Sequence, residues 1–338
     1  MELETGIRNR KIRKKQIAGA IVIFLIITSV FLHQISKKSK DFKKEDDEIR
    51  KFIFKEEIKL KQKFVAGEPD AEFKIALIKL EGEIIGYPSK YYQKSVSEIV
   101  RSALDLAKQD EKVKGIIIQI NSPGGDIIEV EKIYEKIEEI KKSKIIVSLL
   151  ENIAASGGYY CACGTNKIIA NPLTITGNIG AVILFYNVKE LFEKKLGINM
   201  IVIKSGKHKD IGSPFRKMDI EEKNILQNLV DEAAKRFLNV VLKNRKIRPE
   251  DIPIVSDGRI FTGIQAKEIG LVDEIGTLKK AIETIKEMTK IKKLKVIEYY
   301  YKPSLFELLG FYGSEKLYFS KFHQISTPVL KYIWIPNI

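Results

Sequence analysis

A short apolar run that ends in small residues does most to restrict the fold of this 338-residue chain. Residues 144–150 (KIIVSLL) are rich in β-branched side chains, which is typical of a strand buried in a parallel sheet. Residues 154–160 (AASGGYY) follow, and the small and aromatic residues from 157 to 164 fit the start of a helix. The sequence therefore places Ser156 where a strand passes into a helix, at the carboxyl edge of a sheet.

Two interpretations of Ser156 remain open at this point. The alanines and glycines beside it let a substrate backbone approach closely, and the turn aims backbone N–H groups at the serine, as in a nucleophile elbow. The G-x-S-x-G pattern of that elbow is absent. The alternative is a glycine-rich turn with an incidental serine, because small-residue turns are common.

Strand and helix patterns alternate along the rest of the chain, which predicts an α/β fold with a parallel sheet and right-handed crossovers. Strands are predicted at 75–80, 114–120, 144–150, 177–185 and 200–203. Helices are predicted at 95–109, 127–142, 218–245 and 277–289, with a strand–helix–turn unit at 259–276.

A second turn that could take part in catalysis is formed by residues 121–126 (NSPGGD), between a predicted strand and a predicted helix. Pro123 restricts the backbone, whereas Gly124 and Gly125 permit conformations that other residues avoid. Free N–H groups in this turn would form an oxyanion hole, which stabilises the charge that develops in acyl transfer. The alternative is an ordinary turn that caps a helix.

A nucleophilic serine needs a base, and two neighbouring residues compete for that role. His33 flanks an apolar segment and His323 lies near the C-terminus, so His208 is the histidine expected near the sheet. Lys209 adjoins it, and a catalytic lysine must be neutral, which requires burial to lower its pKa. A carboxylate on the same side, such as that of Asp210, would raise that pKa. In an extended segment Lys209 faces away from His208 and Asp210.

The formal net charge of +15 is concentrated near the N-terminus. Residues 1–64 hold 17 Lys and Arg against 9 Asp and Glu, a net charge of +8 out of +15. This charge surrounds an apolar segment, so anionic lipid headgroups are the expected partner rather than nucleic acid, for which no motif is present. Cys161 and Cys163 have no neighbouring ligand pair and predict core thiols rather than a zinc site or a disulfide framework.

Residues 17–32 form an apolar run interrupted only by Thr28 and Ser29, and at about 1.5 Å per residue they extend roughly 24 Å. A cleaved signal peptide is the alternative, but residues 33–37 lack a small-x-small cleavage site. We therefore expect an uncleaved single-pass anchor. The predicted organisation is a basic tail (1–15), a transmembrane anchor (16–35), a charged helical linker (36–72), a catalytic domain (73–298) and an aromatic-rich tail (299–338).

Five motifs together resemble the signal peptide peptidases of the protease IV family. They are residues 121–126, 154–160, 176–180 (TGNIG), 204–216, and the stretch that begins at 258–263 (GRIFTG) and ends at Gly276. They occur in the family's order, and the resemblance covers roughly residues 75–289. It implies a Clp protease/crotonase-like fold and a Ser–Lys dyad, with Ser156 as nucleophile and Lys209 as general base. Gly124 and Gly125 match the oxyanion-hole turn. Asn178 stands where the family commonly has a serine that orients the lysine.

The resemblance implies a membrane-anchored serine endopeptidase, a hydrolase that cleaves hydrophobic peptides such as remnant signal peptides. It also implies a homo-oligomer, a domain outside the cytoplasm, and no metal or other cofactor. One alternative is a related peptidase that trims stomatin-like membrane proteins. Others are a Ser156–His208 mechanism, a crotonase-like acyl-CoA enzyme, and a non-catalytic membrane scaffold. The acyl-CoA enzyme would leave both Ser156 and the membrane anchor without a role.

Overall fold

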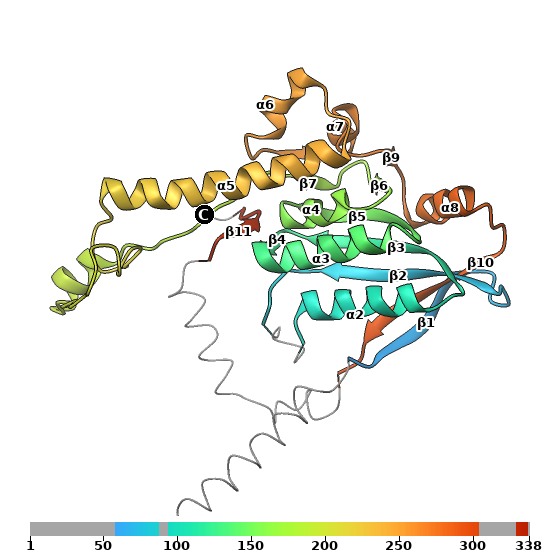
Figure 1. Ribbon diagram of the computed structural model, residues 1–338, viewed down its shortest axis with the longest axis horizontal. Coiled ribbons are helices and arrows are strands. Elements are labelled where there is room, and N and C mark those ends of the chain that lie inside the picture. The colour runs from blue at the N-terminus through green and yellow to red at the C-terminus, as the bar shows by residue number, and fades with distance from the viewer. Residues whose placement is uncertain (1–57, 88–93, 304–328, 337–338) are drawn as a thin grey trace, which may run out of the picture. The chain divides into compact units, whose positions relative to one another are not determined.

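A computed structural model describes residues 58–87, 94–303 and 329–336 (Figure 1). The chain divides into two units, Met1–Lys59 and Leu60–Ile338, and all the helices and strands described below belong to the second. The predicted basic tail, the anchor and most of the predicted linker lie outside the described residues. Within the described ranges, none of the helices has the length and apolar character needed to cross a membrane.

A mixed sheet with parallel central strands organises the second unit, which confirms the predicted α/β class. The strand order is β1 (Leu60–Gly67), β10 (Leu294–Tyr301), β2 (Phe73–Glu81), β3 (Val113–Ser122), β5 (Ile145–Ala155), β6 (Lys167–Ala170) and β9 (Glu274–Ile275). Only the pair of β1 and β10 is antiparallel along this path. The end of β5 also pairs with β7 (Ile175–Gly177), which in turn pairs with β8 (Ile260–Thr262).

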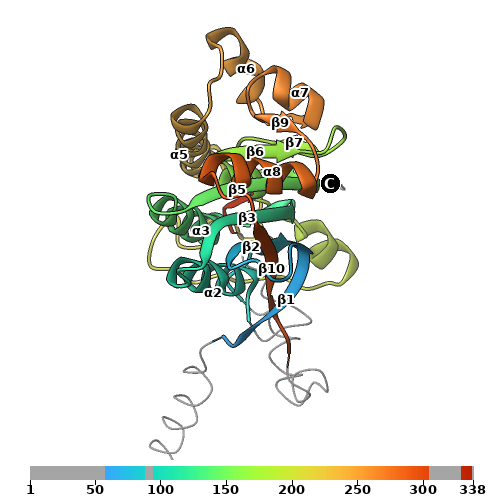
Figure 2. The same cartoon turned by 90° about the vertical axis from the view of Figure 1, so that its right-hand side faces the viewer.

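Helices cover both faces of the sheet (Figures 1 and 2). One face carries α2 (Val96–Gln109), α3 (Ile127–Ile140), α4 (Gly157–Cys163) and the second half of α5 (Ile220–Asn244). The other face carries α8 (Leu278–Thr289). Successive strand residues point to opposite faces of the sheet. Ala76 and Ile78 therefore belong to the hydrophobic core on the face of α2 and α3, whereas Ile75 and Leu77 belong to the core on the face of α8. The short helices α6 (Ile252–Val255) and α7 (Gly263–Glu268) lie between α5 and β9 in the chain.

Capping residues account for where two of the long helices begin. Ser95 accepts a hydrogen bond from the backbone N–H of Glu98, and the Glu98 side chain accepts one from the N–H of Ser95, which starts α2. Asp219 and Glu222 form the same reciprocal pair at the start of α5.

Two local predictions are wrong. Residues 60–67 of the predicted helical linker form strand β1, because β10 offers them an antiparallel edge. The strands predicted at 177–185 and 200–203 are absent, except that Gly177 ends β7 and Val182 forms one isolated bridge. Residues 200–203 are apolar but exposed, and no strand of the described chain pairs with them. A β-like composition does not form a strand without a partner strand.

The described part of the predicted C-terminal tail belongs to the folded unit. Tyr299–Tyr301 complete β10. Further on, β11 (Lys331–Ile333) pairs antiparallel with β4 (Gly124–Asp126), the glycine turn of the sequence. The last described residues therefore lie against the region in which the oxyanion hole is predicted.

Candidate active site

Ser156 lies between β5 and α4, as predicted, in an unusual backbone conformation. Its φ and ψ angles are 52° and −119°, a region that L-residues rarely occupy and that costs roughly 1–3 kcal/mol. Its N–H donates to the Gly177 carbonyl over 2.8 Å, and its carbonyl accepts from the N–H of Tyr160 over 2.9 Å. These bonds hold the strained turn in place and fix the direction of the side chain.

The Ser156 hydroxyl is buried and uncommitted. The residue is 1% exposed, and its Oγ forms no hydrogen bond with any described residue. A buried hydroxyl usually has a partner, and Ser97, Ser148 and Thr284 also lack one among the described residues, so it is the position of Ser156 at the end of β5 that singles it out. Its surroundings therefore suit a nucleophile that awaits both a base and a substrate.

The glycine turn lies directly beside Ser156. A Cβ atom on Gly124, whose φ is +101°, would stand 2.6 Å from the backbone nitrogen of Gly157. The structure thus brings together the turn at 124–125 and the residue after the serine. The N–H of Gly124 donates to Ser122 Oγ over 3.1 Å. This leaves Gly125, together with Gly157 at the first position of α4, as the better candidates for oxyanion donors.

An extended segment of the chain already runs along this turn. Tyr332 pairs with Gly125 and Ile333 with Gly124, while Lys331 exchanges backbone hydrogen bonds of 3.0 Å with Val182 on its other side. The segment therefore pairs with β4 on one side and with Val182, through an isolated bridge, on the other. The Tyr332 carbonyl oxygen lies 3.0 Å from the position that a Cβ of residue 157 would take, which puts this peptide group next to the predicted oxyanion hole.

The side chain of Tyr332 packs between α4 and α5, against Tyr160, Phe237 and Ala233, and this packing site is here called the aromatic pocket. Its ring stacks on Tyr160 at 5.2 Å and lies 4.9 Å from Phe237, measured between ring centroids. Its hydroxyl donates to the Ala233 carbonyl over 2.7 Å, and no part of the residue is exposed. Sequence reasoning missed this pocket; the aromatic composition of the tail was its one visible signal.

Lys331 places a positive charge beside the end of β4. Its amine lies 3.6 Å from Asp126 and pairs with Glu83 over 2.5 Å. Burial opposes the charged form of Lys331, but the two carboxylates raise its pKa overall. Burial also raises the pKa of Asp126, against the effect of Lys331.

Neither predicted base lies beside Ser156 in the single chain. His208 and Lys209 belong to residues 183–219, here called the arm, which precedes α5. Figure 1 shows the arm at the end of α5 remote from α4. No residue of α5 between Glu222 and Ala233 is buried, so about 16 Å of helix separates the arm from the body.

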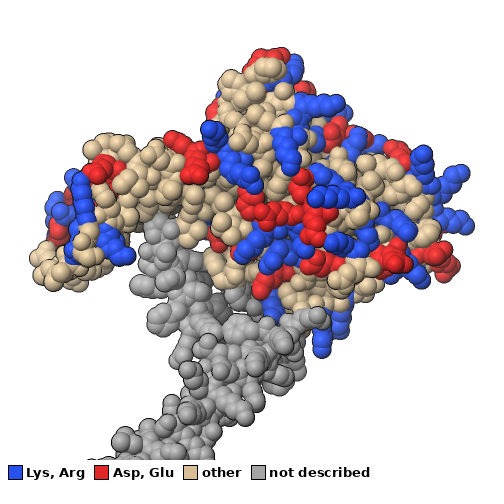
Figure 3. Space-filling model, in the orientation of Figure 1, with Lys and Arg blue, Asp and Glu red and all other residues tan. Residues whose placement is uncertain are grey.

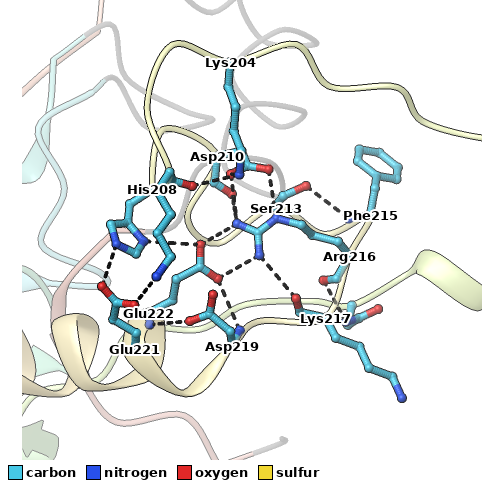
Figure 4. A network of polar contacts seen from close by, with 12 residues as sticks. Lys204, His208, Asp210, Ser213, Phe215, Arg216, Lys217, Asp219, Glu221 and Glu222 are labelled. Atoms are coloured by element: carbon cyan, nitrogen blue, oxygen red, sulfur yellow. Dashed lines mark hydrogen bonds and ion pairs between the residues drawn. The ribbon is translucent and has the colours of Figure 1, made fainter.

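Within the arm the two candidates differ. His208 is committed, since its Nε2 lies 3.0 Å from Glu221 Oε1 (Figure 4). Lys209 is exposed, and its amine has no hydrogen bond or ion pair with any residue in the described ranges. The geometry therefore leaves Lys209 available to act elsewhere.

Asn178 lies next to Gly177, the residue that accepts from the Ser156 N–H. Its φ is +53°, and its N–H donates to the Arg259 carbonyl over 2.8 Å. Its side-chain amide donates to the Gly258 carbonyl over 2.6 Å. These bonds hold the turn behind Ser156, and a role in orienting a lysine stays a prediction.

The described residues contain no cluster of three or more His, Cys, Asp or Glu arranged to hold a metal ion. Cys161 and Cys163 are free and fully buried. Burial raises the pKa of Cys163 to about 12 and that of Cys161 further, so these thiols are core residues as predicted.

Comparison with known proteins places this arrangement in a family. Residues 138–292 match Peptidase family S49, and residues 70–174 match Clp protease. A candidate protease of Synechocystis is 38% identical over 204 residues, which cover 60% of this chain and 70% of the relative. The chain belongs to peptidase family S49. The predicted class, a serine peptidase and hydrolase, is that of the family, and the predicted Clp protease/crotonase-like fold is confirmed.

Two further relatives agree with this assignment. A candidate signal peptide peptidase of Enterococcus faecium is 42% identical over 197 residues, covering 58% of this chain and 57% of the relative. A candidate protease of Methanocaldococcus jannaschii is 38% identical over 207 residues, covering 61% and 66%. The chain thus spans less than two thirds of these two relatives. The resemblance to signal peptide peptidases is confirmed at the level of the family.

Proposed function

We propose that this S49 chain is a membrane-anchored serine endopeptidase in which Ser156 attacks hydrophobic peptides that lie extended along β4. The observation that carries the proposal is the strand β11, an extended peptide seated on the glycine turn with a carbonyl beside Gly157. A substrate that added to β4 in the same way would gain main-chain hydrogen bonds for affinity and side-chain pockets for specificity.

The chemistry follows from groups near that carbonyl. Neutral Lys209 accepts the Ser156 proton as Oγ attacks, and the N–H groups of Gly125 and Gly157 stabilise the oxyanion. When the tetrahedral intermediate collapses, the C–N bond breaks and the resulting lysine ammonium returns its proton to the leaving amine. Water, deprotonated by Lys209, then attacks the acyl-enzyme. The bond between the acyl carbon and Ser156 Oγ breaks, and the lysine ammonium returns its proton to Oγ, which releases the acid and restores both residues.

The pocket between α4 and α5 suggests the substrate class. Tyr160 and Phe237 form an aromatic wall, and the Ala233 carbonyl is the polar acceptor within it. A large apolar or aromatic side chain next to the cleaved bond would fit there. Segments of signal peptides left in a membrane supply such side chains. Peptides trimmed from stomatin-like membrane proteins would fit as well.

We propose that Lys209 acts on the Ser156 of a neighbouring copy in a homo-oligomer. The arm projects away from its own site (left side of Figure 3). It exposes nine large apolar side chains, with Ile201 at 84% and Ile203 at 97% exposed. The full set is Leu184, Tyr186, Leu191, Leu196, Ile198, Met200, Ile201, Val202 and Ile203. Exposed apolar surface of this kind favours association, and burial against a partner would desolvate the Lys209 amine.

The anchor at 16–35 and a catalytic domain outside the cytoplasm remain parts of this proposal. The anchor is supported by the apolar run between two basic stretches. An anchored enzyme would keep its active site close to peptides that stay in the bilayer. The domain's side of the membrane is supported only by the resemblance to the family.

The experiment is cleavage of a fluorogenic hydrophobic peptide by the full chain in detergent. Ser156→Ala and Lys209→Ala each abolish cleavage, whereas His208→Ala retains it. Co-expression of the Ser156→Ala and Lys209→Ala chains restores part of the activity, because mixed oligomers contain intact sites. Loss with His208→Ala but not with Lys209→Ala would contradict the lysine assignment, and no recovery in mixed oligomers would contradict its action across subunits.

A further inference from the structure

A compact ionic cluster in the arm includes both chain neighbours of Lys209, His208 and Asp210 (Figure 4). The Arg216 guanidinium contacts both oxygens of Asp210, with Nε–Oδ2 at 2.8 Å and Nη2–Oδ1 at 2.9 Å. It also contacts both oxygens of Glu222, with Nη1–Oε2 at 2.7 Å and a second contact from Nη2 to Oε1. Arg216 thus makes two bidentate contacts, which fix the relative positions of Asp210 and Glu222 far better than a lysine at position 216 would.

The cluster ties the loop to the start of α5. Glu222 lies in the first turn of α5, and its side chain is 2% exposed. Asp210 is the residue after Lys209, and its side chain is 12% exposed. On the other side of Lys209, His208 contacts Glu221 of the same helix. Both neighbours of Lys209 are thus anchored to α5, which fixes the backbone from which the free amine extends.

The cluster also uses up the carboxylates near Lys209. Asp210 Oδ1 accepts from Lys204 Nζ over 2.6 Å as well as from Arg216. Glu221 pairs with Lys207 and His208, and Glu222 pairs with Arg216 and accepts a hydrogen bond from the backbone N–H of Asp219. Of the five basic residues between 204 and 216, Lys209 is the one without a carboxylate partner among the described residues.

We infer that the Asp210–Arg216–Glu222 cluster positions Lys209 for catalysis and keeps Asp210 from pairing with its amine. The inference rests on the proposed role of Lys209 as the general base. A carboxylate next to a base of this kind favours the charged ammonium, which cannot accept a proton. Arg216 is a positioning residue in this account, because it acts through Asp210 and Lys209 and does not touch the substrate.

The test compares the full chain in detergent with Arg216→Gln, and with Asp210→Asn/Arg216→Gln, by kcat and KM for a fluorogenic peptide across pH 6 to 10. Arg216→Gln lowers kcat at pH 7 by roughly tenfold, with KM within about twofold. It also moves the rising limb of the pH profile about one unit upward, because Asp210 loses Arg216, keeps its contact with Lys204, and stabilises the ammonium of Lys209 with its second oxygen. The double variant returns the limb to its original pH, because it has no carboxylate at position 210.

Lys194→Gln is the matched control, since it removes a surface ion pair of the arm, with Glu190, in which both side chains are 67% exposed. It leaves kcat and the pH profile unchanged. If Arg216→Gln shows no thermal unfolding transition and is therefore not folded, Arg216→Lys takes its place. The pH profile of Arg216→Lys is expected to shift in the same direction by a smaller amount.

The outcomes separate the two proposals. The cluster's role is overturned, with the base assignment intact, if Lys209→Ala is inactive but the pH profile of Arg216→Gln does not shift. A shift of the profile that persists in the double variant overturns it as well. Wild-type rates in Lys209→Ala overturn the base assignment itself, and with it the role of the cluster.

Discussion

The carbonyl oxygen of Tyr332 lies 2.0 Å from the position that a Cβ atom of Gly124 would occupy. Two segments more than 200 residues apart in the chain are therefore packed backbone to backbone at the candidate site. The same hypothetical Cβ would stand 2.6 Å from the Gly157 nitrogen. Only glycine allows this approach. The φ of +101° at Gly124 is also a conformation that favours glycine.

Gly124→Ala is expected to abolish most peptidase activity, because the new methyl group pushes both the peptide strand and the Gly157 N–H out of place. Loss of one oxyanion donor costs about 100-fold or more in kcat. The control is Gly82→Ala, where φ is +80° but no atom lies within 4 Å of the added carbon. That control loses about 1 kcal/mol of stability and keeps its activity. Equal activity in both variants would contradict the site.

Removal of residues 329–338 is expected to activate the enzyme toward added peptides. The strand β11 occupies the edge of β4 that a substrate would use, so it competes as a tethered ligand at high effective concentration. Without it, KM for a hydrophobic peptide falls by roughly tenfold while kcat stays the same. Val329→Ala, which trims a 43% exposed side chain beside β11, is the control and changes neither value. An unchanged or higher KM in the truncated chain would show that peptides bind elsewhere.

Ser156→Gly is expected to be more stable than Ser156→Ala, although both are inactive. Glycine tolerates φ 52° and ψ −119°, whereas alanine keeps the strain of the native serine. Urea unfolding of the two variants should differ by about 1 kcal/mol in favour of glycine. A more stable alanine variant would mean that the turn relaxes in solution.

Acid should weaken the arm through its ionic cluster. Hydrogen bonds from Arg216 lower the pKa of Glu222 to about 2, and Arg216 and Lys204 hold the pKa of Asp210 well below its usual range. A lowered pKa in the folded state gives stability that is present above the ordinary carboxyl pKa of about 4 and is lost as pH falls toward 2.

The measurement is amide hydrogen exchange of residues 204–222, corrected for its intrinsic pH dependence. In Glu222→Gln, the amides of residues 204–222 exchange faster than in the wild type at pH 7. This difference in exchange rate disappears near pH 2. Glu250→Gln removes a carboxylate whose side chain is 67% exposed, and it serves as the control. A difference in the Glu222 variant that persists unchanged at pH 2 would exclude this carboxylate as its source.

Local patterns were enough to predict the central strands and the main helices. The strands β2, β3 and β5 are apolar runs buried on both faces, and α2 and α5 show helical spacing with capping residues. Ser156 and the Gly124 turn could be paired from the sequence, because neighbouring parallel strands end at the same edge of a sheet.

The missed features depend on distant partners. The strands β1 and β11 form only because β10 and β4 offer them an edge; the sequence of β1 is rich in charge, and β11 is only three residues long. The exposed run at 200–203 has strand composition but no partner strand in the described chain. The distance of Lys209 from Ser156 depends on how far α5 extends beyond the body, which residues 204–216 alone do not reveal.

The most direct measurement is covalent labelling of the full chain with a fluorophosphonate, followed by mass spectrometry of the modified peptide. We predict a single adduct on Ser156 that forms faster after removal of residues 329–338 and is absent in Lys209→Ala. Labelling of a different serine, or equal labelling of Ser156 with and without Lys209, would contradict the proposed Ser–Lys mechanism.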